Sequence, residues 1–449
     1  MSSEAIRTDI KGLIEIALPI SIGTFVQFLV LLTDNYFLAR VSENAINGAG
    51  NAGLTYLTFG MLIFGSATGI QILVARRKGE ENDELQIRTG RTGLLLNSFI
   101  GILLCLTLYL LNQGALGSLF QSAEIRDVFE PYLGTRLWGA LPYGITFALT
   151  AYWTGLARTK LLLAVSLTTA FFNLLLDYAL IEGNLGFSAM GHIGAARASL
   201  CSEILGFFVA VILMFKVERR FLQLPKKLDY EVLQSWWKIS APLMGQLLLT
   251  VGVWTSFFFF VEKVGSTELK VSHIGRNAFM FAFIVTSGIG QTTRTVVSTL
   301  IGAKRQSELI PTVKRLWLLN IIGALILTHG FILYPELISN IFFDEPSHIE
   351  MMSKTFTTLF IAVIGYGSAH ILLTTLEGSG GTKRAFTVEM LGAGMYFLGA
   401  WYLTTQISEG YRPIEVIWRV EWIYFSFIII GCYLALRNGK WKNGLESLS

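Results

Sequence analysis

The second half of this 449-residue chain repeats the first half at a constant offset of 223 residues. Pro19 returns as Pro242, and Gly65 returns as Gly288. The longer matches, which need no insertion, pair Leu95, Leu96 and Asn97 with Leu318, Leu319 and Asn320, Tyr143 and Gly144 with Tyr366 and Gly367, and Gly155, Thr159 and Lys160 with Gly378, Thr382 and Lys383. Such a repeat predicts two halves that share one fold.

The composition places both halves in a membrane. Hydrophobic residues make up 53% of the chain and charged residues 15%, and apolar runs recur from Ile10 to Leu436. We expect an all-α integral membrane protein with about twelve transmembrane helices, divided between an N-terminal lobe (1–220) and a C-terminal lobe (221–449). The expected spans are 11–37, 50–76, 92–113, 131–155, 161–183, 194–216, 234–262, 271–301, 312–334, 352–376, 384–406 and 414–436.

Basic residues gather in alternate loops, which predicts the orientation of the chain. The basic set is Arg76, Arg77, Lys78, Arg158, Lys160, Arg219, Arg220, Lys226, Lys227, Lys304, Arg305, Lys383, Arg384, Arg437, Lys440 and Lys442, and the opposite loops carry Glu124, Asp127, Asp344, Glu345 and Glu409. By the positive-inside rule, both termini are cytoplasmic in a multi-pass protein of the plasma membrane, of the bacterial inner-membrane type. Both halves then start inside, so we expect a pseudo-two-fold axis along the membrane normal.

Several functions are disfavoured by what the sequence lacks. Cys105, Cys201 and Cys432 lie in expected spans without a CxxC motif, so neither disulfides nor a cysteine metal site is expected. The net charge of +4 is too small to indicate a surface that binds nucleic acid. A soluble enzyme is excluded by the composition, and no phosphate-binding glycine loop supports ATP hydrolysis. We find no nucleophile or acid–base pair for an intramembrane enzyme, and expect a monomer without a cofactor.

Several stretches have the form of family motifs. They are ALPISIGTFVQFLVLLTDNYFLARV in the first span, ARRKGE and IGAKRQ after spans two and eight, TGLARTK and LEGSGGTK after spans four and ten, and FFNLLLDYALIEG with GHIGAARAS in spans five and six. These stretches resemble the multidrug and toxic compound extrusion (MATE) family of cation-coupled antiporters. The resemblance covers nearly the whole chain. It implies two six-helix lobes that export a substrate by alternating access between them.

Two carboxylates mark the N-terminal lobe. Asp34 lies late in the first span and Asp177 late in the fifth, and Asn173 shares a helical face with Asp177 four residues away. Buried ionisable groups are costly in lipid, so this set is a functional candidate. Alternatively, Asp34 is solvated near the interface, and Asn173 only bonds a neighbouring helix. The resemblance assigns Asp34, Asn173 and Asp177 to the cation site, where they would hold sodium if sodium is bound; the coupling ion is H⁺ or Na⁺.

The sixth span adds further candidates for cation coupling. Glu203 lies four residues after Ser199, and it is either a relay or a structural partner. Arg197 stands where the MATE family usually has a neutral residue. Near Asp177 its charge would partly replace a metal ion and disfavour sodium coupling. The alternative is an arginine that faces lipid headgroups.

The C-terminal lobe lacks the same acidic set at the repeated positions. Asp34, Asn173, Asp177 and Glu203 correspond to Phe257, Tyr396, Ala400 and Ser426. We therefore expect coupling in the N-terminal lobe. The C-terminal lobe instead places Arg294 in span eight, opposite Gln71 of the first half, where it either contacts substrate or reaches the interface. Tyr143 and Tyr366 could also line a substrate cavity, or they belong to the packing core.

The leading hypothesis is a secondary active antiporter that exports small amphipathic organic compounds or drugs in exchange for protons or sodium. The alternative is a flippase for lipid-linked oligosaccharide or lipid, as found in related transporter families. A flippase would favour several cavity cations and fourteen or uneven spans. A channel would not need a two-lobe repeat with one acidic lobe.

Overall fold

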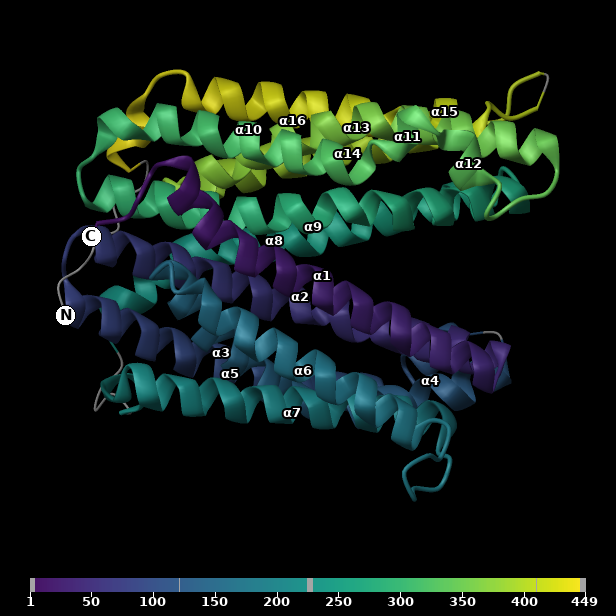
Figure 1. Ribbon diagram of the computed structural model, residues 1–449, viewed down its shortest axis with the longest axis horizontal. Helices are drawn as coiled ribbons and strands as arrows, with labels where there is room; N and C mark the ends of the chain where they lie inside the picture. Colours follow the sequence, from purple (N-terminus) through teal and green to yellow (C-terminus); the bar gives the residue numbers. More distant parts are fainter. Residues whose placement is uncertain (1–4, 121, 224–228, 409, 445–449) are drawn as a thin grey trace. The chain divides into compact units, whose positions relative to one another are not determined.

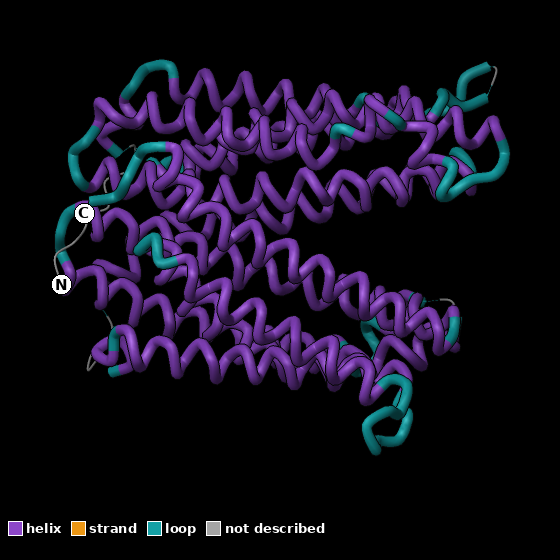
Figure 2. Tube along the Cα trace, in the orientation of Figure 1, coloured by secondary structure: helices purple, strands orange, loops and turns teal. Residues whose placement is uncertain are grey.

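The protein is an all-α membrane protein. The computed structural model describes residues 5–120, 122–223, 229–408 and 410–444, and within them the regular structure consists of helices (Figure 2). Lys226, Lys227 and Glu409, which the sequence analysis assigned to loops, lie outside the described residues. Nine stretches of the described chain are long and apolar enough to cross a membrane.

The helices follow the order of the expected spans (Figure 1). In the first half they are α1 (Ile10–Val41), α2 (Glu43–Gly79), α3 (Asp83–Leu111), α4 (Ala123–Arg136), α5 (Ala140–Gly155), α6 (Thr159–Leu180) and α7 (Gly191–Val217). In the second half they are α8 (Tyr230–Glu262), α9 (Ser266–Gly302), α10 (Leu309–Thr328), α11 (Gly330–Leu333), α12 (Pro335–Ser339), α13 (Pro346–Gly378), α14 (Thr382–Leu403), α15 (Ile414–Ile417) and α16 (Val420–Leu436).

The fourth expected span is interrupted. The helix α4 begins at Ala123, where the Ser122 hydroxyl accepts from the Ile125 backbone N–H, and the 3-10 helix η2 (Leu137–Gly139) separates α4 from α5. Pro142 in the first turn of α5 has no N–H to continue the ladder of α4. The equivalent position in the second half is Gly365, and there α13 runs without a break.

The described chain forms two compact units whose limits follow the repeat. Unit 1 is Ile22–Met244, and unit 2 joins the residues up to Ser21 to those from Gly245 on. The limit in α1, between Ser21 and Ile22, lies one repeat length before the limit in α8. Each of these two helices contains a proline just before the limit, Pro19 or Pro242. The expected lobes, 1–220 and 221–449, therefore differ from the compact units in the starts of α1 and α8.

The two units repeat several close contacts. In unit 1 the Asn97 side chain donates to the Gly144 carbonyl at 3.3 Å, and in unit 2 Asn320 donates to the Gly367 carbonyl at 3.1 Å. Each glycine allows this approach, because an added Cβ would lie 2.6 Å from the Asn97 carbonyl oxygen or 2.8 Å from Asn320 Nδ2. Residues retained in the sequence repeat therefore make the same helix-to-helix contact in both units.

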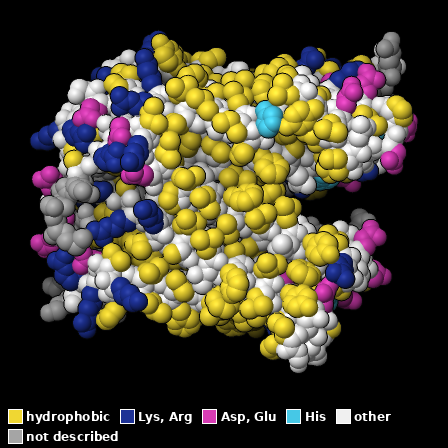
Figure 3. Space-filling model, in the orientation of Figure 1, with side chains coloured by type: hydrophobic (Ala, Val, Ile, Leu, Met, Phe, Trp, Pro, Cys, Tyr) yellow, Lys and Arg dark blue, Asp and Glu magenta, His cyan; other side chains and the backbone are white. Residues whose placement is uncertain are grey.

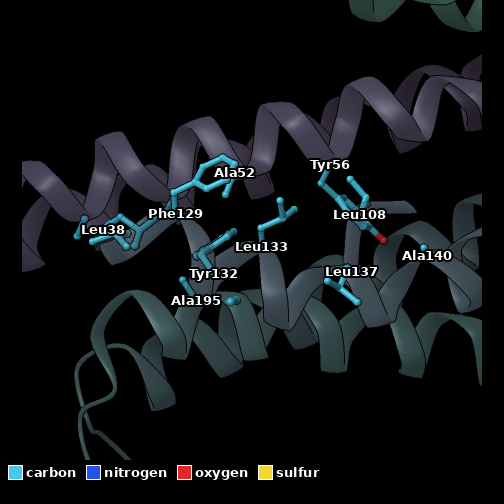
Figure 4. Close-up of a cluster of buried hydrophobic side chains, with 14 of the residues drawn as sticks. Leu38, Ala52, Tyr56, Leu108, Phe129, Tyr132, Leu133, Leu137, Ala140 and Ala195 are labelled. Atoms are coloured by element: carbon cyan, nitrogen blue, oxygen red, sulfur yellow. The ribbon is translucent and has the colours of Figure 1, made fainter. Parts of the chain in front are cut away.

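The core of unit 1 packs α4 against α2 and α7. Its buried side chains include Phe129, Leu133 and Leu137 from α4 and η2 and Ala52 from α2 (Figure 4). On the face shown in Figure 3, hydrophobic side chains cover the middle stretches of the helices, and Lys and Arg gather toward the left-hand end. Apolar middle stretches with charged ends are typical of helices that cross a bilayer.

Candidate functional site

A buried polar cluster lies inside unit 1, and five helices contribute to it. Asp34 comes from α1, Asn173 and Asp177 from α6, and Ser199 and Glu203 from α7. The remaining members are Tyr56 of α2 and Tyr132 and Arg136 of α4. Asp177 is 0% exposed and Asn173 is 2% exposed, whereas Asp34 is half-buried. The structure thus brings together all five residues that the sequence predicted for cation coupling.

The centre of the cluster is a pair of carboxyl groups bridged by an amide. In the amide orientation that satisfies its hydrogen bonds, Asn173 Nδ2 donates to Asp34 Oδ1 at 3.1 Å and to Asp177 Oδ2 at 3.3 Å. The carboxyls of Asp34 and Asp177 also lie within hydrogen-bonding reach of each other. Asp177 Oδ1 is buried and has no donor on it. Because such an oxygen is costly to leave unpaired, this pair is a place for one proton or one small cation.

Ser199 and Tyr132 hold the other side of the amide. Ser199 Oγ lies 3.4 Å from the end of the Asn173 amide that faces away from the carboxyls, and the Tyr132 hydroxyl lies near Ser199. The Ser202 hydroxyl donates to the Ser199 backbone carbonyl one turn earlier on α7, at 2.9 Å. These contacts link α4, α6 and α7 and support the orientation of Asn173.

Glu203 forms a buried ion pair that the sequence reasoning missed. Its Oε1 lies 3.0 Å from Arg136 Nη2, and the two side chains are 15% and 13% exposed. The Arg136 guanidinium lies over the Tyr56 ring, 4.6 Å from its centroid, and Tyr56 donates to Glu203 Oε2 at 3.4 Å. The signal in the sequence was the one charged residue of the fourth expected span, Arg136, and the one acidic residue of the sixth, Glu203, since buried opposite charges are expected to pair.

The cation beside the carboxyl pair is Arg136 and not Arg197. Arg197 is exposed, and its Nη1 lies 3.3 Å from Met190 Sδ. The idea that Arg197 sits near Asp177 is therefore wrong, because α7 turns this residue to the outside. Arg136 interacts electrostatically with both Asp34 and Asp177.

The arrangement does not fit a sodium ion as it stands. Hard cations take oxygen ligands, but the orientation that satisfies the hydrogen bonds of the Asn173 amide turns its nitrogen toward both carboxyls. Among the described residues, no group of three or more His, Cys, Asp or Glu side chains could hold a metal ion. Asp34, Asn173 and Asp177 would present three side-chain oxygens to a cation only in the opposite amide orientation, which leaves the Asn173 amide without these two hydrogen bonds.

In unit 2, Arg294 is paired inside the protein. Its Nε lies 2.5 Å from Glu377 Oε2, and the two side chains are 8% and 0% exposed. Gln246 Nε2 donates to the other oxygen of the same carboxylate at 2.9 Å. Arg294 therefore faces an internal partner and not the interface. Its backbone contacts Gly378, just as the backbone of Gln71 contacts Gly155 at the equivalent place in unit 1.

Two further buried glutamates in unit 2 were missed because they lie at positions that the repeat does not match. Glu389 accepts from Thr250 at 2.9 Å and from the Tyr424 hydroxyl. Glu421 accepts from the Tyr396 hydroxyl at 2.8 Å. Gln246 and Thr250 of α8 donate to Glu377 and Glu389, and their spacing of four places both donors on one face of the helix.

The aromatic candidates for a substrate cavity lie in packed clusters. Tyr143 contacts Tyr56 and Phe147, with ring centroids 6.1 Å and 4.4 Å away, and it lines a small cavity beside Gly60. Tyr366 contacts three rings at 5.3 to 5.6 Å, those of Phe279, His370 and Phe425. Gln71 is 3% exposed. Each of these side chains is at present part of the packing inside its own unit.

Comparison with known proteins decides the family. The model of the MatE family matches residues 19–179 and again residues 242–401, so the two matches begin one repeat length apart. The chain belongs to the MatE family. The resemblance drawn from the sequence motifs is thereby confirmed, and the site described above lies in a member of a family of membrane transporters.

Relatives in this family are full-length matches at low identity. The chain is 25% identical to a probable multidrug resistance protein NorM of Pseudomonas putida, over 90% of this chain and 89% of the relative. It is also 25% identical to a probable multidrug resistance protein NorM of Thermotoga maritima, over 95% and 88% of the two chains. The family is therefore that of the MATE and NorM multidrug efflux transporters.

Solved structures share the fold. A MOP superfamily transporter from Pyrococcus furiosus, described as having a binding pocket of reverse polarity, matches with a TM-score of 0.87 and 16% identity, over 97% of each chain. An outward-facing MATE family transporter matches with a TM-score of 0.87 and 16% identity, over 96% of this chain and 97% of the other. The expected twelve-helix all-α membrane fold is confirmed.

Proposed function

We propose that this protein is a secondary active antiporter that exports small amphipathic organic compounds in exchange for protons or sodium. Membership of a multidrug efflux family supports export of organic compounds. The two units with one repeated fold support alternating access, because each unit can move as a body. We further propose a monomer in a bacterial inner membrane, with both termini cytoplasmic, and a transporter without enzymatic activity.

The observation that carries coupling is the pair of carboxyls of Asp34 and Asp177 on either side of the Asn173 amide, with one carboxyl oxygen left without a donor. The buried glutamates of unit 2 differ from this pair, because Glu377 and Glu389 each accept from two donors and Glu421 accepts from the Tyr396 hydroxyl. A carboxylate that the protein already satisfies acts as structure, whereas an oxygen without a donor is ready to take a cation. Coupling is therefore assigned to unit 1.

The two carboxyls sit on different helices, and this gives a route from ion binding to movement. A cation on the pair neutralises repulsion between α1 and α6 and holds the two helices together; its loss leaves two close negative charges. If the inward-open and outward-open states separate these helices differently, ion binding favours one state over the other. Substrate binding must favour the opposite state for exchange to occur.

The test is dye efflux from vesicles that contain the full-length protein. We expect a proton or sodium gradient to drive efflux, and we expect Asp177→Asn and Asp34→Asn each to reduce ion-driven flux by at least about tenfold, since neither amide can release a proton. Asp344→Asn is the matched control, because Asp344 is exposed and far along the chain from the cluster. Flux that ignores both gradients, or that survives Asp177→Asn at normal expression, would contradict the proposal.

A further inference from the structure

Arg136 is the one cationic side chain in the buried cluster of unit 1, among the residues that the structure describes. The groups that face it come from every helix packed around it. They are Asp34 of α1, Tyr56 of α2, Tyr132 of α4, Tyr143 of α5, Asp177 of α6 and Glu203 of α7. The cluster thus holds three carboxyl groups and one guanidinium.

The ion pair with Glu203 uses only part of the Arg136 guanidinium. Nη2 bonds Glu203, and the ring of Tyr56 covers one face of the group. Nη1 is buried and has no acceptor. The same cluster therefore contains an unpaired N–H group on Arg136 and an unpaired oxygen on Asp177. A charge that is only partly compensated by its own partner acts on the neighbouring carboxyls.

We propose that Arg136 is the built-in counter-cation of the Asp34 and Asp177 pair, and that it makes this site take protons and reject sodium. This inference rests on the proposed function and deepens it, because it names the coupling ion and the residue that selects it. Arg136 acts through its charge on the carboxyl pair and is a specificity-determining residue of the site.

Geometry separates the two ions. A proton needs one lone pair of one carboxyl oxygen, and Asp177 Oδ1 offers it without any rearrangement. A sodium ion needs several oxygen ligands, but the Asn173 amide satisfies its hydrogen bonds only when its N–H groups point at both carboxyls. It would also have to approach a fixed guanidinium charge in a medium of low dielectric constant, where like charges repel strongly. The site accepts the proton and excludes the larger cation.

Sodium binding tests the proposal without any transport measurement. Purified full-length protein is titrated with NaCl, with choline chloride added to hold the ionic strength constant, and both radioactive sodium binding and the unfolding temperature are recorded. We expect no saturable sodium effect for the natural protein. Two variants should gain saturable sodium binding: Arg136→Gln, and the charge-balanced double variant Arg136→Gln with Glu203→Gln. Their sodium affinity should be at least about tenfold higher than any residual sodium affinity of the natural protein.

Three companion variants make the result decisive. Arg136→Lys keeps the charge and should stay insensitive to sodium, and Arg197→Gln is the matched control on an exposed arginine. Adding Asp177→Asn to the charge-balanced double variant should abolish the gained binding. Saturable sodium binding by the natural protein would overturn the proposal, and so would a folded charge-balanced variant that remains insensitive. Because binding is read without substrate, a failure of dye export would refute the antiport function separately.

Discussion

Asn97 and Asn320 occupy equivalent positions in the two units, yet their amide oxygens have different partners. Asn97 Oδ1 accepts from the Ser66 hydroxyl, and both side chains are fully buried. The residue equivalent to Ser66 is Ile289, and Asn320 Oδ1 is left without a donor. The buried asparagine of unit 1 therefore has a hydrogen-bond donor on its amide oxygen, whereas the equivalent asparagine of unit 2 has none.

This difference gives a prediction for Ser66→Ala. The substitution should lower the free energy of unfolding by about 1 to 2 kcal/mol, because it leaves Asn97 Oδ1 buried without a donor. Thermal unfolding of the purified protein in detergent measures the effect. Ser98→Ala is the control, since the Ser98 hydroxyl only bonds the Leu94 carbonyl of its own helix. Equal unfolding temperatures for Ser66→Ala and Ser98→Ala would contradict the prediction.

Among the residues of the buried cluster, the sequence predicted the pair of carboxyls but not the arginine beside it. Asp34, Asn173 and Asp177 could be found because polar groups late in apolar spans are rare and expensive. Arg136 escaped notice because it lies near the start of an expected span, where an arginine normally reaches water. Its depth became clear only when α4 was seen to begin at Ala123, two turns before the expected limit of 131.

The turns between helices are the elements that the repeat preserves in backbone as well as in sequence. Glu81 and its equivalent Lys304 have φ of 56° and 57°, and Ala157 and its equivalent Gly380 have φ of 59° and 94°. All four residues adopt the left-handed conformation that ends a helix before the next one starts. Glycine is used at only one of the four positions, although the backbone favours it at each.

The cost of the left-handed conformation can therefore be tested by placing glycine at position 157 and alanine at position 380. Ala157→Gly should raise the free energy of unfolding by about 0.5 to 1 kcal/mol, since an alanine pays a steric penalty at positive φ that exceeds the entropy cost of glycine. Gly380→Ala should lower it by a similar amount. Thermal unfolding of both variants provides the measurement, and the same direction of change in both would contradict the argument.

The boundaries of the helices were predicted well where the sequence is uniformly apolar. They were predicted poorly where a proline or a buried polar side chain interrupts the apolar run. The ranges expected for the first and eighth spans lie within α1 and α9. The fourth span was expected to be continuous, and the break at η2 traces to Pro142. The expected eighth and eleventh spans correspond to α9 and α14, which bury charged side chains such as Arg294 and Glu389 inside unit 2.

At the scale of the whole molecule, the chain order and the compact units do not coincide. The start of α1 groups with unit 2 and the start of α8 groups with unit 1. The contacts are close: an added Cβ on Gly65 would lie 2.7 Å from the Met244 Cα, and one on Gly288 would lie 2.8 Å from the Ser21 backbone nitrogen. These two contacts are equivalent under the repeat, with the partner helix exchanged.

The exchange predicts how separated halves behave. Residues 1–223 and 224–449, expressed as two chains in the same cells, should purify together through a tag on one of them, because each chain supplies a helix start to the other unit. Each half expressed alone should be lost to degradation. Gly65→Val combined with Gly288→Val should reduce recovery of the untagged half, and halves that do not copurify would contradict the role given to the exchanged helices.

The exchanged starts of α1 and α8 also bear on how such a chain could arise. A single copy of the repeat would leave its own first half-helix without a place to pack, and would offer an empty place to the same segment of a neighbour. Two identical copies would satisfy both needs by trading these segments, as in a domain-swapped dimer. Joining the two copies end to end then adds only a linker. Gene fusion on this route would preserve an assembly that was already interlocked, and the two halves could afterwards diverge in their buried charges.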